Sequence, residues 1–205
     1  MGRTGRMIVG SCVLVGATVL ITNQVVSQDP KAGDQKPGEQ QALPWLKYTV
    51  PGEHHKHIAA LAGKWKTEVK MWMGPTADPQ VSQGTADYEW IMGGRFLRQT
   101  VRGEFMGGVF EGEGLLGYDN FKKKYVSSWV DNMGTALFTS TGRCDESGKV
   151  ITMEGRMDDV MSGRANQKFR SVMRIVNKNK HTDEMYTTGA DGKEFKMLEI
   201  TYTRR

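Results

Sequence analysis

The sequence predicts an all-β protein: an antiparallel meander of about ten strands that closes into a β-barrel, with a short helix before the first strand. Three observations lead to this prediction. After Gly63 the hydrophobic period is two rather than 3.6. Short turn sequences, and no helical patterns, separate the strand-like runs. So many consecutive strands favour closure, because a closed barrel leaves no exposed sheet edge.

The N-terminal segment has the organisation of a secretory signal peptide. Two arginines precede an apolar run over residues 7–21, and Val25 and Ser27 occupy the small-residue positions of a cleavage site. We therefore expect cleavage of residues 1–27 and export to the periplasm or the medium. A retained signal anchor is the alternative, because the run extended to Val26 reaches roughly 20 residues, enough to cross a bilayer. An uncleaved segment would be the protein's contact with a membrane.

The next segment, residues 28–44, is rich in Pro, Gly, Gln and charge and nearly empty of large apolar residues. It cannot bury enough surface to offset chain entropy, so we expect a disordered linker. The remaining residues, 45–205, suffice for one domain, and no repeat is visible. After cleavage Cys144 is the only cysteine, so an intramolecular disulfide is excluded.

The charge distribution argues against a nucleic-acid partner. The formal net charge is +5, but the 28 basic residues are scattered among 23 acidic ones. Such a pattern is typical of a mixed solvated surface. The oligomeric state is left open by the sequence.

The folded part begins with the sequence PGEHHKHIAALAGKW, in which Ile58 and Leu61 give a short amphipathic pattern and Gly63 a stop signal. The first strand, 64–73, places Trp65, Thr67, Val69, Met71 and Met73 on one face. The later strands are predicted at about 84–92, 95–103, 108–118, 124–132, 135–144, 149–157, 168–177, 182–188 and 194–203.

Charged residues indicate which strand faces point outward. By this criterion the following residues point inward: Ile151, Met153, Gly155, Met157, Phe169, Ser171, Met173 and Ile175. Together with the first strand they predict an interior rich in methionine and aromatic residues. A barrel of this size can hold a small apolar ligand, and methionine suits an adaptable pocket. Methionine that merely fills gaps in the core explains the same pattern.

The chain resembles the bacterial family of domain of unknown function 1579 over nearly everything after about residue 53. The resemblance is carried by LAGKW (61–65), GTADYEWIMGGRFLRQ (84–99), FEGEGLLGYDNFKKKYVSSWVDNMGT (110–135), GKVITMEGRMDD (148–159) and DGKEFKMLEITYTRR (191–205). It implies a calycin-like barrel, related in shape to lipocalins and to the haem-binding nitrobindins, whose GxW motif is similar to Gly63 and Trp65. It implies no activity, because none is established for the family.

The longest shared motif contains EGEG, in which Glu111 and Glu113 share one strand face and Gly112 and Gly114 the other. Two carboxylates in a cavity could serve as acid and base. If the glycines face inward instead, the glutamates are solvated and the strand bends or packs closely beneath a bulky neighbour such as Trp129. The following DNFKKK predicts a solvated hairpin turn.

On the next strand Tyr125, Ser127, Trp129 and Asp131 share a face. Pointing inward, Trp129 and Asp131 would form an aromatic wall beside a carboxylate, although a structural hydrogen bond between them explains the same pair. The complete set of predicted ligand-binding residues is Trp65, Met71, Glu89, Arg95, Trp129, Asp131, Met153 and Tyr186.

Metal and cofactor signals are sparse. In HHKH, His54 and His57 lie on one side of a helical turn, but only Glu53 could complete a ligand set, so we predict no metal site. His181, at a predicted turn, could ligate haem through an open barrel mouth, although no CxxCH motif is present. Haem is thus a secondary hypothesis, and the cofactor is otherwise left open.

We find no GxSxG, phosphate-binding loop or dinucleotide-binding motif, and Cys144 fits a small residue at a strand end as well as a reactive thiol. The sequence therefore favours an exported, non-catalytic barrel that binds a small apolar ligand. One alternative is an isomerase-like or hydrolytic enzyme that uses Glu89, Asp131 or Tyr186 in the lumen. Another is a structural or interaction module at the cell surface.

Overall fold

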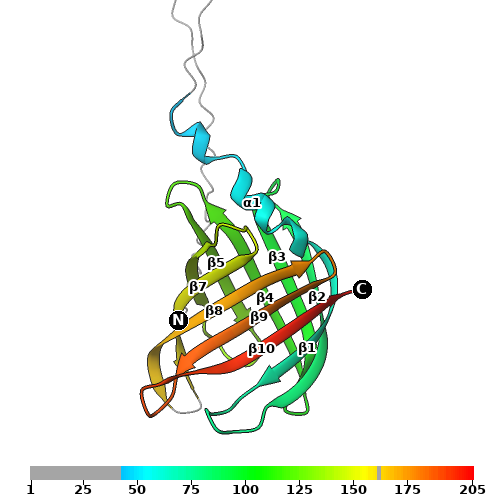
Figure 1. Cartoon of the computed structure of the whole chain (residues 1–205), viewed down its shortest axis with the longest axis vertical. Coiled ribbons are helices and arrows are strands. Elements are labelled where there is room, and N and C mark those ends of the chain that lie inside the picture. The colour runs from blue at the N-terminus through cyan, green and yellow to red at the C-terminus, as the bar shows by residue number, and fades with distance from the viewer. Residues whose placement is uncertain (1–42, 161–162) are drawn as a thin grey trace, which may run out of the picture. The chain divides into compact units, whose positions relative to one another are not determined.

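The computed structural model describes residues 43–160 and 163–205, which form a closed barrel of ten antiparallel strands (Figure 1). The predicted signal peptide and nearly all of the predicted linker lie outside these ranges. Within them, no helix has the length and apolar character needed to cross a membrane. The strands are β1 Gly63–Met71, β2 Gln80–Ile91, β3 Phe96–Phe105, β4 Gly108–Asp119, β5 Lys124–Asp131, β6 Phe138–Cys144, β7 Val150–Asp159, β8 Arg164–Asn177, β9 Lys180–Thr188 and β10 Glu194–Arg204.

The strand order confirms the predicted meander. Every strand pairs with its sequence neighbours, and β1 closes the barrel by pairing with β10 from Trp65↔Arg204 to Met71↔Leu198. Two of the differences from the predicted boundaries concern candidate site residues. β1 ends at Met71, so Met73 lies outside the strand and is exposed, and β9 begins at Lys180, which brings His181 into the sheet.

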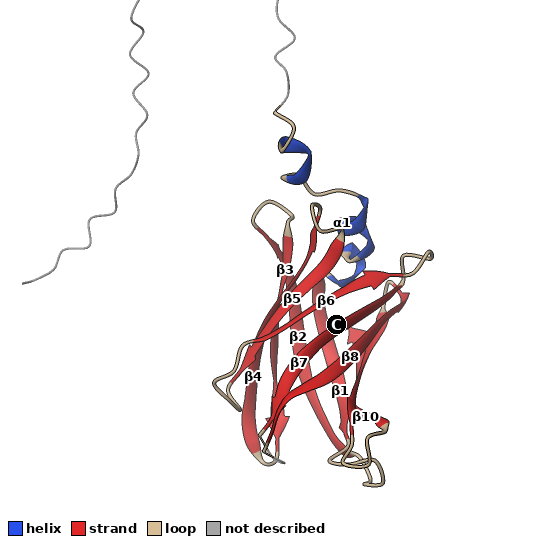
Figure 2. Cartoon of the chain, turned by 90° about the vertical axis from the view of Figure 1, so that its left-hand side faces the viewer, coloured by secondary structure: helices blue, strands red, loops and turns tan. Residues whose placement is uncertain are grey.

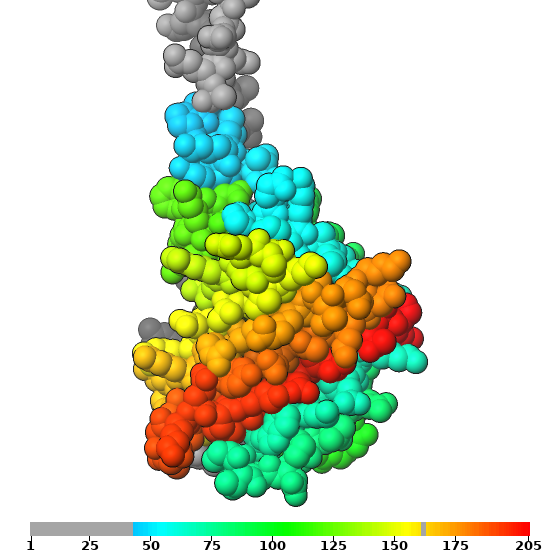
Figure 3. Space-filling view, in the orientation of Figure 1, coloured from blue at the N-terminus to red at the C-terminus, as the bar shows by residue number. Residues whose placement is uncertain are grey.

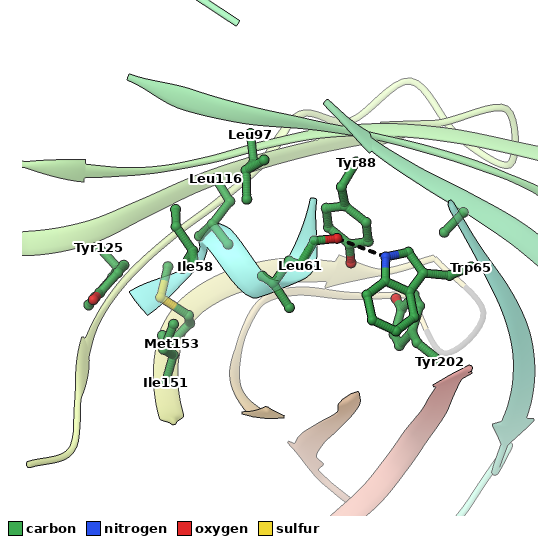
Figure 4. Packing of buried hydrophobic residues seen from close by; sticks show 11 residues of the cluster. Ile58, Leu61, Trp65, Tyr88, Leu97, Leu116, Tyr125, Ile151, Met153 and Tyr202 are labelled. Carbon is green, nitrogen blue, oxygen red and sulfur yellow. Dashed lines mark hydrogen bonds between the residues drawn. The ribbon is translucent and has the colours of Figure 1, made fainter. Parts of the chain in front are cut away.

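Helical segments cover one end of the barrel. The predicted helix is present as α1 Glu53–His57 followed by the 3₁₀ turn η2 Ala59–Leu61, and a further 3₁₀ turn, η1 Leu46–Tyr48, precedes them. Ile58 and Leu61 are fully buried among the barrel side chains (Figures 2 and 4). We call this the capped end, and the opposite end, where the described connections contain no helix, the loop end.

The cap is fastened to the barrel by hydrogen bonds. The indole nitrogen of Trp65 donates to the Leu61 carbonyl at 2.7 Å. The Arg204 guanidinium donates to the carbonyls of Ala60 and Ala62 at 2.9 and 2.7 Å and lies 3.8 Å from the centre of the Trp65 ring. These bonds satisfy carbonyls at the end of a helical segment, which otherwise lack partners.

Burial divides the inward-facing residues into two groups. Those of the half next to the cap are buried: Trp65, Tyr88, Leu97, Leu116, Tyr125, Ile151 and Tyr202. Most of those in the loop half keep part of their surface accessible: Val69, Met71, Val101, Phe110, Trp129, Phe138, Met185 and Leu198. Phe169 and Thr187, each 8% exposed, are buried there. In the space-filling view of Figure 3, the cyan residues of the cap lie against one end of the molecule. The lumen is therefore tightly packed at the capped end and less so toward the loop end.

Candidate functional site

The glycine-rich strand β4 turns its glycines inward, as one of the two interpretations of EGEG required. Gly112 and Gly114 are buried, and a Cβ atom at either position would collide with the Trp129 ring. Glu111 and Glu113 point outward, and Glu111 lies 3.4 Å from Arg102. The absent side chains thus create the space in which Trp129 lies, and these glutamates do not form a luminal acid–base pair.

Trp129 and Asp131 both face the lumen, since their partners on β4 are the inward-facing Gly114 and Gly112. They are also bonded to each other, because the Trp129 indole nitrogen donates to Asp131 Oδ2 at 2.9 Å. Asp131 Oδ1 accepts the backbone N–H of Met133 at 3.0 Å. With both carboxylate oxygens engaged, the pair offers the lumen chiefly an aromatic wall.

Three more predicted residues also face inward, at different depths. Trp65 is 0% exposed and enclosed by the cap, so it forms part of the lumen floor rather than an accessible surface. Met153 is likewise buried in the core, whereas Met71 lies at the loop end and keeps accessible surface. Of the three, only Met71 can contact a ligand without rearrangement.

The expectation that Glu89, Arg95 and Tyr186 would accompany Trp129 in the lumen was wrong about their location. Glu89 is on the outer face and is bonded to Arg98 at 2.7 Å. Tyr186 is also outside, where its hydroxyl donates to Glu184 at 3.2 Å and the Arg170 guanidinium lies over its ring. Because side chains alternate between the two faces of a strand, the residues directly before and after Glu89 and Tyr186 point inward instead.

Arg95 lies in the turn before β3. Its guanidinium donates to the carbonyls of Thr49 at 2.9 Å and Met92 at 3.0 Å. Its role is therefore to hold the N-terminal segment against the barrel rim, and it does not enter the lumen.

A polar cluster near the lumen floor was missed by the sequence analysis. Ser171 Oγ donates to Asp183 Oδ1 at 2.6 Å. The Gln99 amide donates to the Tyr202 hydroxyl at 3.2 Å, and the Tyr88 ring packs edge-on against that of Tyr202 with 6.1 Å between ring centres. We call Tyr88, Gln99, Ser171, Asp183 and Tyr202 the luminal polar cluster. Its members come from β2, β3, β8, β9 and β10, so it exists only once the barrel closes.

Asp183 is the charged group of this cluster. Removal from bulk water raises the pKa of its carboxyl to about 6, although the hydrogen bond from Ser171 acts in the opposite direction. Among the described residues, no cation forms an ion pair with it, and Asp183 Oδ2 has no hydrogen-bond donor. A carboxyl in the lumen with one oxygen unused is a group on which a ligand can be recognised.

His181 lies next to this cluster, toward the cap. It is 1% exposed, stacked on Tyr202 with 4.0 Å between ring centres and packed edge-on against Trp65 at 4.4 Å. Neither ring nitrogen has a hydrogen-bond partner among the described residues. Burial, with a smaller contribution from the Arg204 charge, lowers the pKa of His181 to about 3, so the ring is neutral.

This environment does not fit haem ligation. Iron would have to approach a ring nitrogen, and both nitrogens are shielded by side chains that fasten the cap. The sequence placed His181 at an open turn, but β9 begins one residue earlier and turns the side chain into the core. We therefore derive no haem chemistry from this residue.

The other three histidines belong to α1. His54 stacks on Tyr118 with 4.1 Å between ring centres, and His57 Nδ1 lies 2.8 Å from the Tyr125 hydroxyl. His55 is buried and accepts the Gly52 backbone N–H at 3.0 Å. In the described part of the chain no group of three potential ligands is arranged to hold a metal ion. These histidines attach the cap to the rim.

Cys144, at the end of β6, is half-buried. Burial, assisted by the neighbouring Asp145, raises the pKa of its thiol, which lowers the thiolate fraction at neutral pH. This environment favours the structural interpretation of Cys144 over a reactive one.

One accessible hollow lies at the rim of the loop end. It measures about 370 Å³ and is lined by inward-facing residues of β1, β2 and β3, including Val69, Met71 and Phe105, and by outward-facing ones such as Val81 and Glu104. Volumes of this order accommodate small molecules. The site is thus an apolar region toward the loop end, with the luminal polar cluster deeper inside.

Fold and site together define a closed antiparallel β-barrel with one capped end and a partly accessible lumen. The chain belongs to the family described as "Protein of unknown function (DUF1579)", whose model matches residues 50–204. Among solved structures, Rv2717c from M. tuberculosis is similar, with a TM-score of 0.53 and 14% identity over 76% of this chain and 99% of that chain. A redesigned β-barrel matches with a TM-score of 0.40 and 15% identity over 73% of this chain and 95% of that chain. No curated protein matches.

Proposed function

We propose that this protein is a non-catalytic, exported barrel that binds a small, largely apolar ligand in the loop half of its lumen. The observation that carries the proposal is the contrast in burial along the barrel axis. Most inward-facing apolar residues beneath the cap are buried, whereas most of those in the loop half keep accessible surface. Apolar surface left accessible within a concave site is a favourable place for an apolar ligand.

The composition of this half supports the same function. Trp129, Phe110, Phe138, Met71 and Met185 supply aromatic and polarizable contacts. Methionine adapts its conformation to irregular ligand shapes, and aromatic rings provide large apolar contact areas. The inward glycines of β4 accommodate the Trp129 ring itself, so that this ring can line the lumen.

The enzyme alternative is less well supported. It required Glu89, Asp131 and Tyr186 to meet in the lumen, but Glu89 and Tyr186 are outside and Asp131 is bonded to Trp129 and Met133. The interaction-module alternative required a closed lumen, whereas the loop half retains accessible surface. Ligand binding requires neither a luminal meeting of these polar residues nor a closed lumen.

The experiment is a titration with N-phenyl-1-naphthylamine, a neutral apolar probe that fluoresces when it leaves water. Val101 faces inward between Ala86 and Gly112, so Val101→Trp fills part of the lumen. We expect this change to weaken probe binding about tenfold or more, because it occupies the space that an apolar ligand needs. Val130→Trp, on the exposed outer face of β5, is the matched control and should bind as the wild type does. Equal binding by both variants would show that the probe binds elsewhere.

Export is the second part of the proposal and rests on the N-terminal sequence. Arginines followed by an apolar run and small residues near 27 have the pattern of a cleaved leader. The intact mass of the protein recovered after secretion tests it. A mass corresponding to residues 28–205 supports cleavage, and a full-length, membrane-associated chain supports the signal-anchor alternative.

A further inference from the structure

The luminal polar cluster carries an inference about the chemistry of the ligand, which rests on the proposed function. Asp183 lies on β9 between the inward-facing Met173 of β8 and Ile200 of β10. It is half-buried, so part of the carboxylate remains accessible within the lumen. Ser171 fixes one oxygen at 2.6 Å, and the other has no donor among the described residues. The carboxylate is therefore held in one orientation by Ser171, and its second oxygen can still accept a hydrogen bond from a ligand.

In the described part of the chain, no positively charged side chain forms an ion pair with Asp183. Arg204 also faces inward, but its guanidinium is occupied by Trp65 and by the carbonyls of Ala60, Ala62 and Lys178. Lys196, from the same strand as Tyr202, pairs with Glu184 and Glu199 instead. A carboxylate removed from water without a cation is costly, and a cationic ligand group would remove that cost.

The remaining members of the cluster are compatible with a cation. Tyr88 and Tyr202 contribute hydroxyl oxygens and aromatic rings, and Gln99 orients the Tyr202 hydroxyl at 3.2 Å. Toward the loop end, the second inward carboxylate, Asp131, adds negative charge to the lumen. An anionic ligand would meet two carboxylates and no available cation among these residues.

The apolar region lies between this cluster and the loop end. From Asp183 to the end of β9 at Thr188 the strand advances by about 17 Å, which a strand tilt of about 40° reduces to roughly 13 Å along the barrel axis. Apolar side chains line this distance, including Met185 on β9 and Leu198 on β10. An alkyl or aryl body can lie along them while its head group reaches Asp183.

We propose that the ligand is an amphiphilic amine whose ammonium group is bound by Asp183 and whose apolar body occupies the loop half of the lumen. The ammonium would donate to Asp183 Oδ2 and lie near the tyrosine hydroxyls. Charge-assisted hydrogen bonds of this kind are stronger than those of a neutral hydroxyl.

The test compares three probes of equal chain length, octylamine, 1-octanol and octanoate, in displacing N-phenyl-1-naphthylamine from the purified wild-type protein at pH 7.5. We expect octylamine to displace the probe at an about tenfold lower concentration than 1-octanol, and octanoate to be the weakest. In Asp183→Asn, octylamine should fall to the level of 1-octanol while 1-octanol is unchanged. Asp87→Asn, on the exposed outer face of β2, is the control and should keep the wild-type order.

The outcomes separate this inference from the proposed function. Equal displacement by octylamine and 1-octanol overturns the amine assignment and leaves apolar binding standing. Failure of N-phenyl-1-naphthylamine and of all three compounds to bind overturns both. A preference for octylamine that persists in Asp183→Asn shows that another group recognises the amine. The wild-type series decides the ligand class even if the variant does not fold, and Asp183→Glu, which keeps the charge, should retain part of the preference.

Discussion

The two halves of the barrel share one topology but differ in how their interiors are filled. In the capped half, Ile58 and Leu61 from the helical segment complete a core around Trp65. In the loop half, inward glycines of β4 accommodate the Trp129 ring, and most apolar side chains keep accessible surface. The comparison indicates that the capped half supplies most of the stability, which allows the loop half to remain available for a ligand.

Burial also has opposite consequences for one titratable group in each region. Beneath the cap, burial keeps His181 neutral and lowers its pKa to about 3. On the side toward the lumen, burial raises the pKa of Asp183 to about 6. Both shifts have the same physical cause, because removal from water penalises the charged form of either group.

The largest predicted effect concerns His181 at acid pH. Its folded pKa lies below its usual value of 6.5, so its contribution to stability is present above about pH 6.5 and is lost as the pH falls toward 3. The loss amounts to as much as about 5 kcal/mol.

His181→Phe, which cannot be protonated, tests this. Between pH 7.5 and pH 3 its free energy of unfolding, measured with urea, should fall by about that much less than the free energy of the wild type. His54→Phe, at an exposed position of α1 where burial lowers the pKa of the ring in the same direction, should reduce the acid sensitivity far less. An unchanged acid sensitivity in His181→Phe would mean that the cap does not seal the ring from water.

A pair of tryptophan variants tests the halves directly. Trp65→Ala removes a fully buried ring that contacts Arg204 and His181, and should lower the free energy of unfolding by about 4 kcal/mol. Trp129→Ala removes a half-buried ring and should cost about 2 kcal/mol. Urea unfolding at pH 7.5 measures both. Equal losses would show that stability is shared evenly along the barrel.

Asp183 gives an effect of opposite sign. Its folded pKa of about 6 lies above the usual 3.8, so the folded state binds the extra proton, and stability falls as the pH rises from about 4 to 6. The neighbouring groups Tyr88, Tyr202 and His181 stay neutral across this range, and Glu184, the next residue on β9, makes a smaller contribution that also raises the pKa of Asp183. Asp183→Asn should therefore be more stable than the wild type at pH 8 by up to about 3 kcal/mol and nearly equal to it at pH 4. Thermal unfolding at the two pH values, with Asp87→Asn as the outer-face control, measures the difference. A variant that is less stable at pH 8 would contradict the assigned environment.

The smallest effect concerns the inward glycines. A Cβ at Gly112 would collide with the Trp129 ring, so Gly112→Ala should cost about 1–3 kcal/mol and alter Trp129 fluorescence. At Gly108, on the same strand, the nearest atom to such a Cβ is 3.5 Å away, an ordinary contact. Gly108→Ala should change the free energy of unfolding by no more than about 0.5 kcal/mol. Similar costs at the two positions would mean that the Trp129 ring does not depend on the absence of a side chain at Gly112.

Much of the fold could be predicted from local pattern. Alternation with a period of two identified the strands, and the charged residues of β7 and β8 correctly turned Met153 and Ser171 inward. The site was harder to predict. Glu89 and Tyr186 have the chemistry of site residues, but strand alternation places both outside. In the sequence HTDEMYTT both faces of β9 carry polar residues, so no pattern marked His181 and Asp183 as inward.

By itself, the sequence determined that this chain forms a closed meander with a short helix before it, because period-two alternation and turn residues act over a few neighbours. Only the tertiary structure decided which end is sealed and what lines the lumen. Arg204 reaches the carbonyls of Ala60 and Ala62 more than 140 residues away in the chain. The luminal polar cluster likewise collects residues from five strands. Such groupings depend on the register with which the barrel closes, which no local segment of the sequence specifies.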